Sequence, residues 1–312
     1  MYKFKGGKMF TRKIMCVVFI VFFVGCGSVQ TIKKFTEDKC SVKKVPYKFD
    51  EEDYEAIVLE NSLIKVVILP GYGARIVEYI LKSTNHNQFD NSAGNPGLKD
   101  IVGEYGESSY SAGNFFCMSP YKATVNEGSN EASVYVTASS DFVKVERTMT
   151  IYSESSRLNI KVKYTNLGPD TIKAFMVRLH PPMSIGGNYG ANDIILIPDE
   201  GRVNQVKEDG YYKPDFGWWM GFDPKEKEAV ILTFNPEEVG KLYLWIGGDS
   251  YNMEYMGKPK EAKKGDSVSL ECNYFIVKSA DEVNKLIESK EIVLSDAELV
   301  RLKTEVANLF GK

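Results

Sequence analysis

The chain has two histidines, and one of them stands where an extended segment would present it. His180 precedes Pro181 and Pro182. Proline disfavours the helical region for the residue before it, so His180 is held in an extended conformation. Because a histidine titrates near pH ~6.5, it suits proton exchange close to neutral pH. The alternative is a strand-end histidine that is hydrogen-bonded for structure alone.

Three further side chains are candidates to act with His180. Arg178 lies two residues earlier on the same predicted strand, so it points to the same face. Glu254 is a candidate carboxylate, and it could equally be a surface residue. His86 lies in the polar segment 84–88, where a solvated loop side chain is the simpler interpretation.

The cysteines and the metal-ligand spacings give no support to a metal centre. The sequence has no CxxC or HExxH spacing, so a zinc site has no motif behind it. Cys40, Cys117 and Cys272 remain after residue 26, and a disulfide between Cys117 and Cys272 is open to them in an oxidising compartment. The simpler interpretation is that at least one of the three is a small buried apolar residue. We expect no metal and no cofactor.

The first 26 residues have the pattern of a secretion signal that ends at a cysteine. Five Lys and Arg residues lie in segment 3–13, an apolar run covers 14–25, and Cys26 follows. This pattern is typical of a signal peptide, and the run is shorter than the ~20 residues that span a bilayer. Segment 23–26 (Phe-Val-Gly-Cys) resembles the bacterial lipobox, which implies a lipid on Cys26. An ordinary cleaved signal and a single membrane anchor are the alternatives.

The composition indicates one globular domain with an acidic balance. Apolar residues make up 43% of the chain and aromatic residues 12%, which fits a substantial core. The formal net charge is −3, and loss of the five basic residues of the signal would make it about −8. We expect no nucleic-acid partner, because such binding needs a cationic face.

These observations divide the chain into three predicted parts. Residues 1–25 are predicted to be a lipoprotein signal peptide, and residues 26–50 the lipidated cysteine and a flexible tether. Residues 51–312 are predicted to form a single domain. The expected location is the cell envelope, where the lipid on Cys26 would hold the protein on a bacterial membrane, facing the periplasm or the exterior.

Short β-branched runs separated by Gly, Pro and Asn predict consecutive antiparallel strands from Tyr54 onward. Segment 157–164 shows this best, since its apolar and polar residues alternate. Residues 83–115 are rich in Asn, Ser and Gly and predict a long loop, which in a compact domain tends to be functional. Capping-box spacings at Ser279 and Ser295 predict two short C-terminal helices. The fold class is therefore all-β, a sandwich or a barrel.

Four segments of the chain contain short motifs, and the order of these motifs along the chain is informative. Segment 60–76 contains a Pro-Gly turn before an Arg-Ile pair that begins with Arg75, and segment 157–166 is a strand that ends in an Asn turn. Segment 177–182 ends in His-Pro-Pro, and segment 252–277 contains a carboxylate before a long strand. This order resembles the galactose mutarotase-like (aldose 1-epimerase-like) superfamily. The resemblance implies a large antiparallel β-sandwich with a carbohydrate ligand.

The resemblance also implies roles for the candidate residues. His180 would be the general acid on the sugar ring oxygen, and Glu254 would be the general base on the anomeric hydroxyl, which needs one protonated and one ionised group. Arg178 would hold a sugar hydroxyl, and Arg75 and His86 would belong to the same site. The chain departs from the family pattern at Tyr255, where the family has a proline after the base.

An aromatic segment offers a surface for the same ligand. Residues 211–219 include two tyrosines, a phenylalanine, Trp218 and Trp219, and flat aromatic faces are common in the lining of ligand pockets. The alternative is that Trp218 and Trp219 close one end of the sandwich. Two functions remain open at this point: aldose epimerisation by His180 and Glu254, and a non-catalytic sugar-binding or structural envelope lipoprotein.

Overall fold

The computed structural model describes residues 39–49, 51–91, 99–103, 116–188, 193–197, 201–204, 210–247 and 250–311; side chains are described in these ranges except at 99–103, 201–204, 247 and 250. The predicted signal peptide and Cys26 lie outside the described residues. Among the helices that are described, none is long and apolar enough to cross a bilayer.

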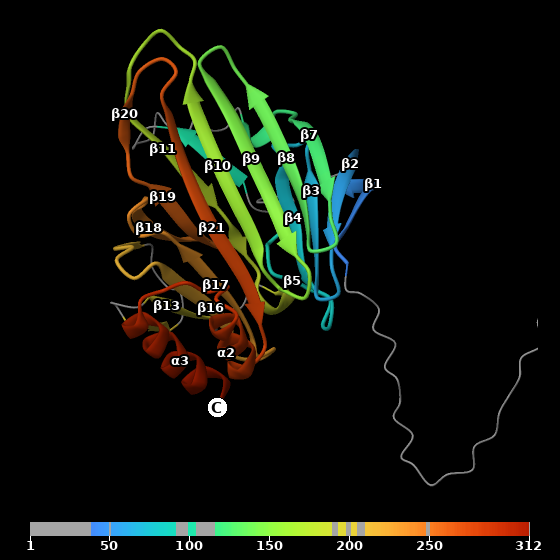
Figure 1. Ribbon diagram of the computed structural model, residues 1–312, viewed down its shortest axis with the longest axis vertical. Coiled ribbons are helices and arrows are strands. Elements are labelled where there is room, and N and C mark those ends of the chain that lie inside the picture. The colour runs from blue at the N-terminus through green and yellow to red at the C-terminus, as the bar shows by residue number, and fades with distance from the viewer. Residues whose placement is uncertain are drawn as a thin grey trace, which may run out of the picture. The chain divides into compact units, whose positions relative to one another are not determined.

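The described strands form three sheets in which every pairing is antiparallel (Figure 1). The five-stranded sheet runs β1 (Ser41–Phe49), β2 (Glu52–Glu60), β3 (Ile64–Leu69), β4 (Arg75–Leu81) and β5 (His86–Asn87). The nine-stranded sheet runs β14 (Gly201–Asn204), β13 (Ile194–Ile197), β16 (Trp218–Asp223), β17 (Glu228–Phe234), β21 (Ser267–Val277), β10 (Leu158–Asn166), β9 (Val143–Tyr152), β8 (Glu131–Ser139) and β7 (Lys122–Glu127).

The seven-stranded sheet carries the candidate residues. Its main path runs β15 (Gly210–Tyr212), β18 (Val239–Gly247), β19 (Ser250–Gly257), β11 (Ile172–His180) and β20 (Lys260–Ala262). In addition, β12 (Pro182–Met183) pairs with β19, and β6 (Lys99–Gly103) pairs with β11. These sheets confirm the predicted large antiparallel β-sandwich.

Alternation along the strands builds the core between the sheets. On β10, Leu158, Ile160, Val162 and Tyr164 are buried in one large apolar cluster that draws on all three sheets. Lys161, between them, faces outward and is exposed. Because successive side chains of a strand point to opposite faces, the prediction for segment 157–164 is confirmed.

Buried aromatic rings connect the three sheets. Tyr79 of β4 packs on Phe89, which meets Tyr274 of β21 edge-on, and Tyr274 meets Tyr255 of β19 in the same way. The Tyr79 hydroxyl donates to the carbonyls of Ser156 at 2.5 Å and Tyr274 at 3.1 Å. Desolvation raises the pKa of Tyr79, Tyr255 and Tyr274 well above the ordinary value, so these hydroxyls stay neutral.

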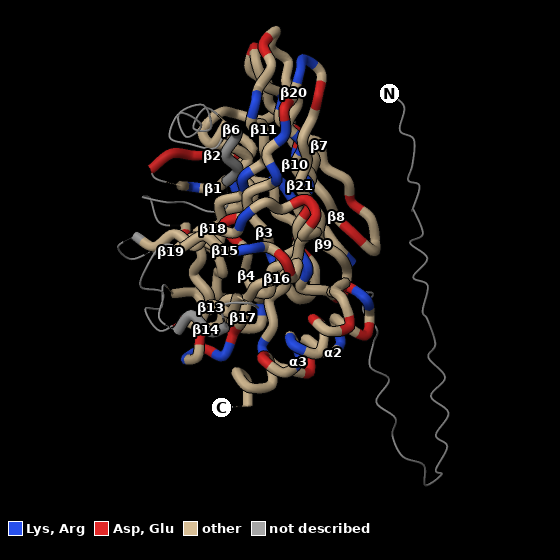
Figure 2. The backbone as a smooth tube through the Cα atoms, turned by 90° about the vertical axis from the view of Figure 1, so that its left-hand side faces the viewer, with Lys and Arg blue, Asp and Glu red and all other residues tan. Residues whose placement is uncertain are grey.

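Two helices pack on the outer face of the nine-stranded sheet. The helices α2 (Ala280–Glu288) and α3 (Asp296–Phe310) begin as predicted, because the side chains of Ser279 and Ser295 accept from the backbone N–H three residues later. The two helices lie beside the ends of β16, β17 and β21 (Figure 1), and the side chains of their apolar stripes pack on these strands. The stripes are therefore occupied by packing on the sheet. Basic and acidic residues are interspersed along the described strands and helices (Figure 2).

Two expectations about segments need correction. Residues 41–49, which the sequence predicts to be part of a flexible tether, form β1 and pair with β2 along the whole length of the strand. The lysines of this strand obscure its alternation in the sequence. In the structure, Val45, Tyr47 and Phe49 are less exposed than their neighbours. The predicted loop 83–115 contains β5 and β6 in its described part. Cys40, Cys117 and Cys272 are buried, and no disulfide joins them in the described part of the chain. Desolvation raises the pKa of Cys272.

We predict that Gly73→Ala strongly destabilises the protein. Gly73 has φ +65°, and a Cβ there would lie 2.0 Å from the Cys117 carbonyl oxygen. The free energy of unfolding should fall by roughly 2–5 kcal/mol, from the left-handed conformation together with the overlap. Gly265→Ala is the control, because Gly265 has φ +88° with no atom within 4 Å of the added Cβ. Urea unfolding of both variants measures the difference, and equal losses would contradict the argument.

Candidate functional site

A buried carboxylate lies at the centre of the candidate site. The Glu254 side chain on β19 is 1% exposed. Its Oε2 accepts from Arg178 of β11, through Nε at 2.6 Å, and a terminal nitrogen of Arg178 lies 2.5 Å from the same oxygen. Its Oε1 lies 3.1 Å from Nε2 of His180. The structure therefore brings together the three residues that the sequence placed in one predicted site.

Strand register explains why these side chains meet. In the antiparallel pair β11–β19, Arg178 lies opposite Met256, and Leu179 lies opposite Tyr255. Tyr255 points into the core, so its neighbour Glu254 points to the other face of the sheet. Arg178 and His180 flank the buried Leu179 and share the face of Glu254 for the same reason.

The ring of His180 has two partners on β19. Its Nε2 lies 3.1 Å from Glu254 Oε1 and 3.1 Å from Asn252 Nδ2. When Nε2 carries a proton, it can donate to the carboxylate; when it does not, the Asn252 amide can donate to it. The protonation of Nε2 therefore decides which of the two hydrogen bonds forms. In either state, His180 has a hydrogen-bond partner on β19.

Charge compensation accounts for a carboxylate that is nearly fully buried. Burial of an ion is costly unless a partner of opposite charge and hydrogen bonds replace the water. Arg178, whose side chain is 18% exposed, supplies both, because its planar guanidinium donates from more than one nitrogen. Removal of the arginine would take away the cation that compensates the buried Glu254 charge.

Two tyrosine rings lie on the same face of the seven-stranded sheet as Glu254, on the next two strands. Tyr243 of β18 lies opposite Glu254, and Tyr211 of β15 lies opposite Tyr243. The two tyrosine rings stack with centroids 4.5 Å apart and an interplanar angle of 23°. The Arg178 guanidinium lies 5.8 Å from the Tyr243 ring centroid, and the Lys241 amino group lies 5.2 Å from that of Tyr211. Tyr211 is 58% exposed, so this row ends in an open aromatic face.

Known proteins resemble this chain in structure and not in sequence. No protein-family model and no curated protein matches the sequence. A putative aldose 1-epimerase from Klebsiella pneumoniae subsp. pneumoniae superposes with a TM-score of 0.60 at 9% identity, over 88% of this chain and 88% of that chain. A galactose mutarotase-like protein from Clostridium acetobutylicum gives 0.57 at 11% identity, over 77% and 99%.

A longer protein contains the same architecture. A TPR-domain containing protein from Parabacteroides distasonis superposes with a TM-score of 0.59 at 11% identity, over 77% of this chain, and the chain spans 54% of the length of that protein. Together with the sheet order, these superpositions decide the fold. The chain has the galactose mutarotase-like fold. At these identities the likeness concerns the architecture alone.

The tryptophans do not line the candidate site of this mutarotase-like sandwich. Trp218 lies under the helices, where its indole N–H donates to Glu298 of α3 at 2.9 Å. Trp219 is fully buried and meets Tyr255 edge-on at 6.0 Å. The expectation that they offer faces to a ligand is corrected, since consecutive strand residues point to opposite faces and both faces of β16 are covered. Tyr211 and Tyr243 are the rings beside Glu254.

His86 belongs to a different polar group. Its Nδ1 lies 3.0 Å from Oε1 of the fully buried Glu228 at the start of β17. The other oxygen of Glu228 accepts from Gln88 Nε2 at 2.9 Å, and Gln88 Oε1 accepts from the Gly186 N–H at 3.1 Å. These bonds join β5 to β17 and to the 3-10 turn after β12. The structure therefore gives His86 a partner in the scaffold, where the sequence suggested a solvated loop residue or a ligand contact.

Arg75 also has scaffold contacts at the start of β4. It donates from Nε to the Cys117 carbonyl at 2.9 Å, and its guanidinium lies 4.5 Å from the Tyr72 ring centroid. Neither contact involves Glu254 or His180. Throughout the described part of the chain, no group of three or more His, Cys, Asp and Glu side chains could hold a metal ion.

Two members of the site, Asn252 and Tyr243, are not among the residues predicted from the sequence. Asn252 precedes Glu254 by two residues, and Tyr243 alternates with the buried Leu242 and Leu244. The period of two along each strand carried the signal for both. Only the strand order, which places β18 beside β19, shows that Tyr243 lies opposite Glu254.

We predict that Trp218→Phe destabilises the protein without changing ligand binding. The substitution removes the indole donor and leaves the Glu298 side chain, which is largely buried, without that hydrogen bond. The free energy of unfolding should fall by about 1–3 kcal/mol. Glu298→Gln is the control, because an amide oxygen can still accept from the indole. Urea unfolding measures the loss, and a Trp218→Phe protein of unchanged stability would contradict the assignment.

Proposed function

We propose that this protein binds a carbohydrate on the face of the seven-stranded sheet that carries Arg178, His180, Tyr243 and Glu254. The observation that carries the proposal is the row formed by a buried Arg–Glu–His group and two stacked tyrosines, on adjacent strands. Sugar rings present apolar C–H faces and polar hydroxyl edges. A face that combines aromatic rings with fixed hydrogen-bonding groups is complementary to both.

Each member of the row has a distinct part in this proposal. Tyr211 and Tyr243 offer stacked rings to the apolar face of a sugar. Arg178 offers guanidinium N–H groups to hydroxyls while it holds the Glu254 carboxylate in place. Asn252 and His180 supply donors and acceptors that hydroxyl groups can match, because a hydroxyl both donates and accepts.

A second candidate function is aldose anomer interconversion on the same face. The 3.1 Å separation of His180 Nε2 and Glu254 Oε1 favours it, because the acid and the base of such a reaction must be close enough to reach two oxygens on one carbon. His180 would protonate the ring oxygen while Glu254 takes the proton of the anomeric hydroxyl, so that the bond between the anomeric carbon and the ring oxygen breaks and the open-chain aldehyde forms. The ring oxygen then attacks the other face of the aldehyde, and both protons return to His180 and to the new anomeric hydroxyl. The bond from Arg178 to Glu254 favours the non-catalytic alternative, since it already occupies the carboxylate oxygen Oε2.

The test is saturation-transfer NMR of the full-length protein with galactose and glucose. We expect binding, and we expect Tyr211→Ala to weaken it about three- to tenfold through loss of the stacked face, while Tyr211→Phe retains it. Tyr211 is exposed, so neither change should disturb the fold. Binding that Tyr211→Ala leaves unchanged would overturn the proposed site.

The same spectra decide between binding and catalysis. Faster exchange between the two anomers than in buffer, lost in both His180→Ala and Glu254→Gln, would support the acid and base roles. Binding with unchanged exchange would favour the recognition function. The glutamine variant is chosen because it keeps an oxygen to accept from Arg178, where alanine would leave the guanidinium without this partner.

We also propose that the protein is a lipoprotein of the bacterial cell envelope. The support is the sequence of residues 1–28, with its basic head, short apolar run and Cys26 after a small residue. A lipid there would tether the domain outside the cytoplasm, where a carbohydrate site would meet envelope or external glycans. A single acyl chain gives marginal membrane binding, so stable attachment would need more than one chain.

The lipid is tested by metabolic labelling with an alkyne-bearing fatty acid in bacterial cells. We expect the wild-type protein to carry label and to sediment with membranes, and Cys26→Ala to lose both properties. Cys16→Ala is the matched control, because Cys16 lies inside the predicted signal and should leave labelling unchanged. Label on the Cys26→Ala protein would refute attachment at this residue.

A further inference from the structure

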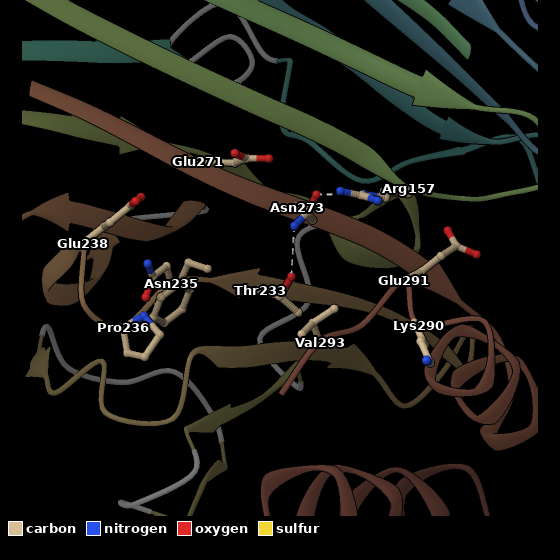
Figure 3. Close-up of a pocket in the computed structure, with 11 residues that line it drawn as sticks. Arg157, Thr233, Asn235, Pro236, Glu238, Glu271, Asn273, Lys290, Glu291 and Val293 are labelled. Atoms are coloured by element: carbon tan, nitrogen blue, oxygen red, sulfur yellow. Dashed lines mark hydrogen bonds between the residues drawn. The ribbon is translucent and has the colours of Figure 1, made fainter. Parts of the chain in front are cut away.

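A polar groove lies on the outer face of the nine-stranded sheet, at the point where the helical layer ends. On β21, Phe275 and Val277 are covered by the helices, whereas Glu271 and Asn273, on the same face, line a groove of about 460 Å³ (Figure 3). This volume falls in the range of about 300–1,000 Å³ that is usual for small-molecule sites.

Two connections form the walls of the groove. The turn between β17 and β18 provides Asn235, Pro236 and Glu238 on one side. The connection between α2 and α3 provides Lys290, Glu291 and Val293 on the other side (Figure 3). The groove is thus built from segments that are far apart in the sequence, and the close-up places the two walls on either side of Thr233.

A ladder of hydrogen-bonded polar side chains crosses the floor. Asn273 Oδ1 accepts from Arg157 Nε and from Asn159 Nδ2, both at 2.8 Å, and Asn273 Nδ2 donates to Thr233 Oγ1 at 3.3 Å. Asn159 Nδ2 also donates to Glu271 at 2.9 Å. The floor is therefore held in one geometry before any ligand arrives, which reduces the entropy cost of binding.

Several groups around this floor keep unused hydrogen-bonding capacity. Among the described residues, the terminal nitrogens of Arg157 and the carboxylate of Glu238 form no hydrogen bond or ion pair with another side chain. Both side chains line the groove, so a ligand there can use these donors and acceptors.

The charges of the lining favour a ligand without net charge. Arg157 and Lys290 are cationic, and Glu238, Glu271 and Glu291 are anionic. Two of the carboxylates already have partners, since Glu271 pairs with Lys161 at 3.2 Å and Glu291 accepts from the Ser155 hydroxyl. The lining offers both donors and acceptors, and a hydroxyl can satisfy either kind.

We propose that this groove is a second carbohydrate site that takes a neutral oligosaccharide. The Arg157 terminal nitrogens, the Asn235 amide and the Glu238 carboxylate bind hydroxyls, while Pro236 and the 78% exposed Val293 contact the apolar faces of the sugar rings. The groove lies on the nine-stranded sheet, away from the Glu254 group on the seven-stranded sheet. The protein then engages a glycan at two independent places, which raises its overall affinity for a polymer.

The test is calorimetric titration of the full-length Tyr211→Ala protein with lactose, maltose and cellobiose. The Tyr211 change weakens the proposed site beside Glu254, and the part of the remaining binding that depends on Arg157 and Glu238 reports the groove. We expect at least one disaccharide to bind, and we expect Arg157→Gln and Glu238→Gln each to weaken its binding about tenfold, through loss of charge-assisted hydrogen bonds.

Matched variants separate the groove from general effects. Glu237→Gln is the control for Glu238→Gln, because Glu237 is its neighbour, is 88% exposed and pairs with Lys258, which does not line the groove. It should leave binding unchanged. Glu238 is exposed on a turn, so its variant tests the proposal even if Arg157→Gln fails to fold.

Three outcomes would overturn the proposal. The first is disaccharide binding that Glu238→Gln leaves as tight as Glu237→Gln does. The second is the absence of heat with all three disaccharides. The third is binding of glycylglycine in their place, which would assign the two charged ends of the groove to a zwitterion. None of these outcomes bears on the site at Glu254, whose test uses Tyr211 variants and monosaccharides.

Discussion

Close packing of five buried aromatic side chains holds the three sheets in one core. Tyr79 and Phe89 come from the five-stranded sheet and the segment after it, Tyr274 and Trp219 from the nine-stranded sheet, and Tyr255 from the seven-stranded sheet. Large rings bury much apolar area and prefer tilted or edge-on contacts. A strand that contributes one of these rings is therefore fixed in both register and facing, and a shift by one residue would turn every side chain on it to the wrong face.

The position of Glu254 follows from this constraint on β19. Because Tyr255 must point into the core, Glu254 must point to the opposite face, together with Asn252. There the carboxylate is still nearly buried, and the arginine and histidine of β11 offset the cost of its burial. The proposed carbohydrate face is in this sense the outer side of the same strands whose inner side forms the core.

The outer face of the nine-stranded sheet is apolar in one part and polar in the next. Where α2 and α3 cover it, the outward residues are apolar, as at Phe275 and Trp218. One step along β21 the helical cover ends, and Asn273 and Glu271 take over with a polar ladder and a groove. The proposed second site thus begins where the apolar surface no longer has a helix to pack against.

The antiparallel all-β class, the helix starts at Ser279 and Ser295, and the shared face of Arg178 and His180 could be predicted from the sequence, because alternation and capping act over a few residues. Which strands lie side by side depends on the tertiary structure, since the partner of a strand can be distant in the chain. The tertiary structure placed Glu254 against Arg178 and Tyr243 against Glu254, and it buried Trp218 under a helix. It also placed His86 beside Glu228, and not in the group around His180. Local period predicts the face on which a residue lies, but only the long-range pairing of strands decides what that face meets.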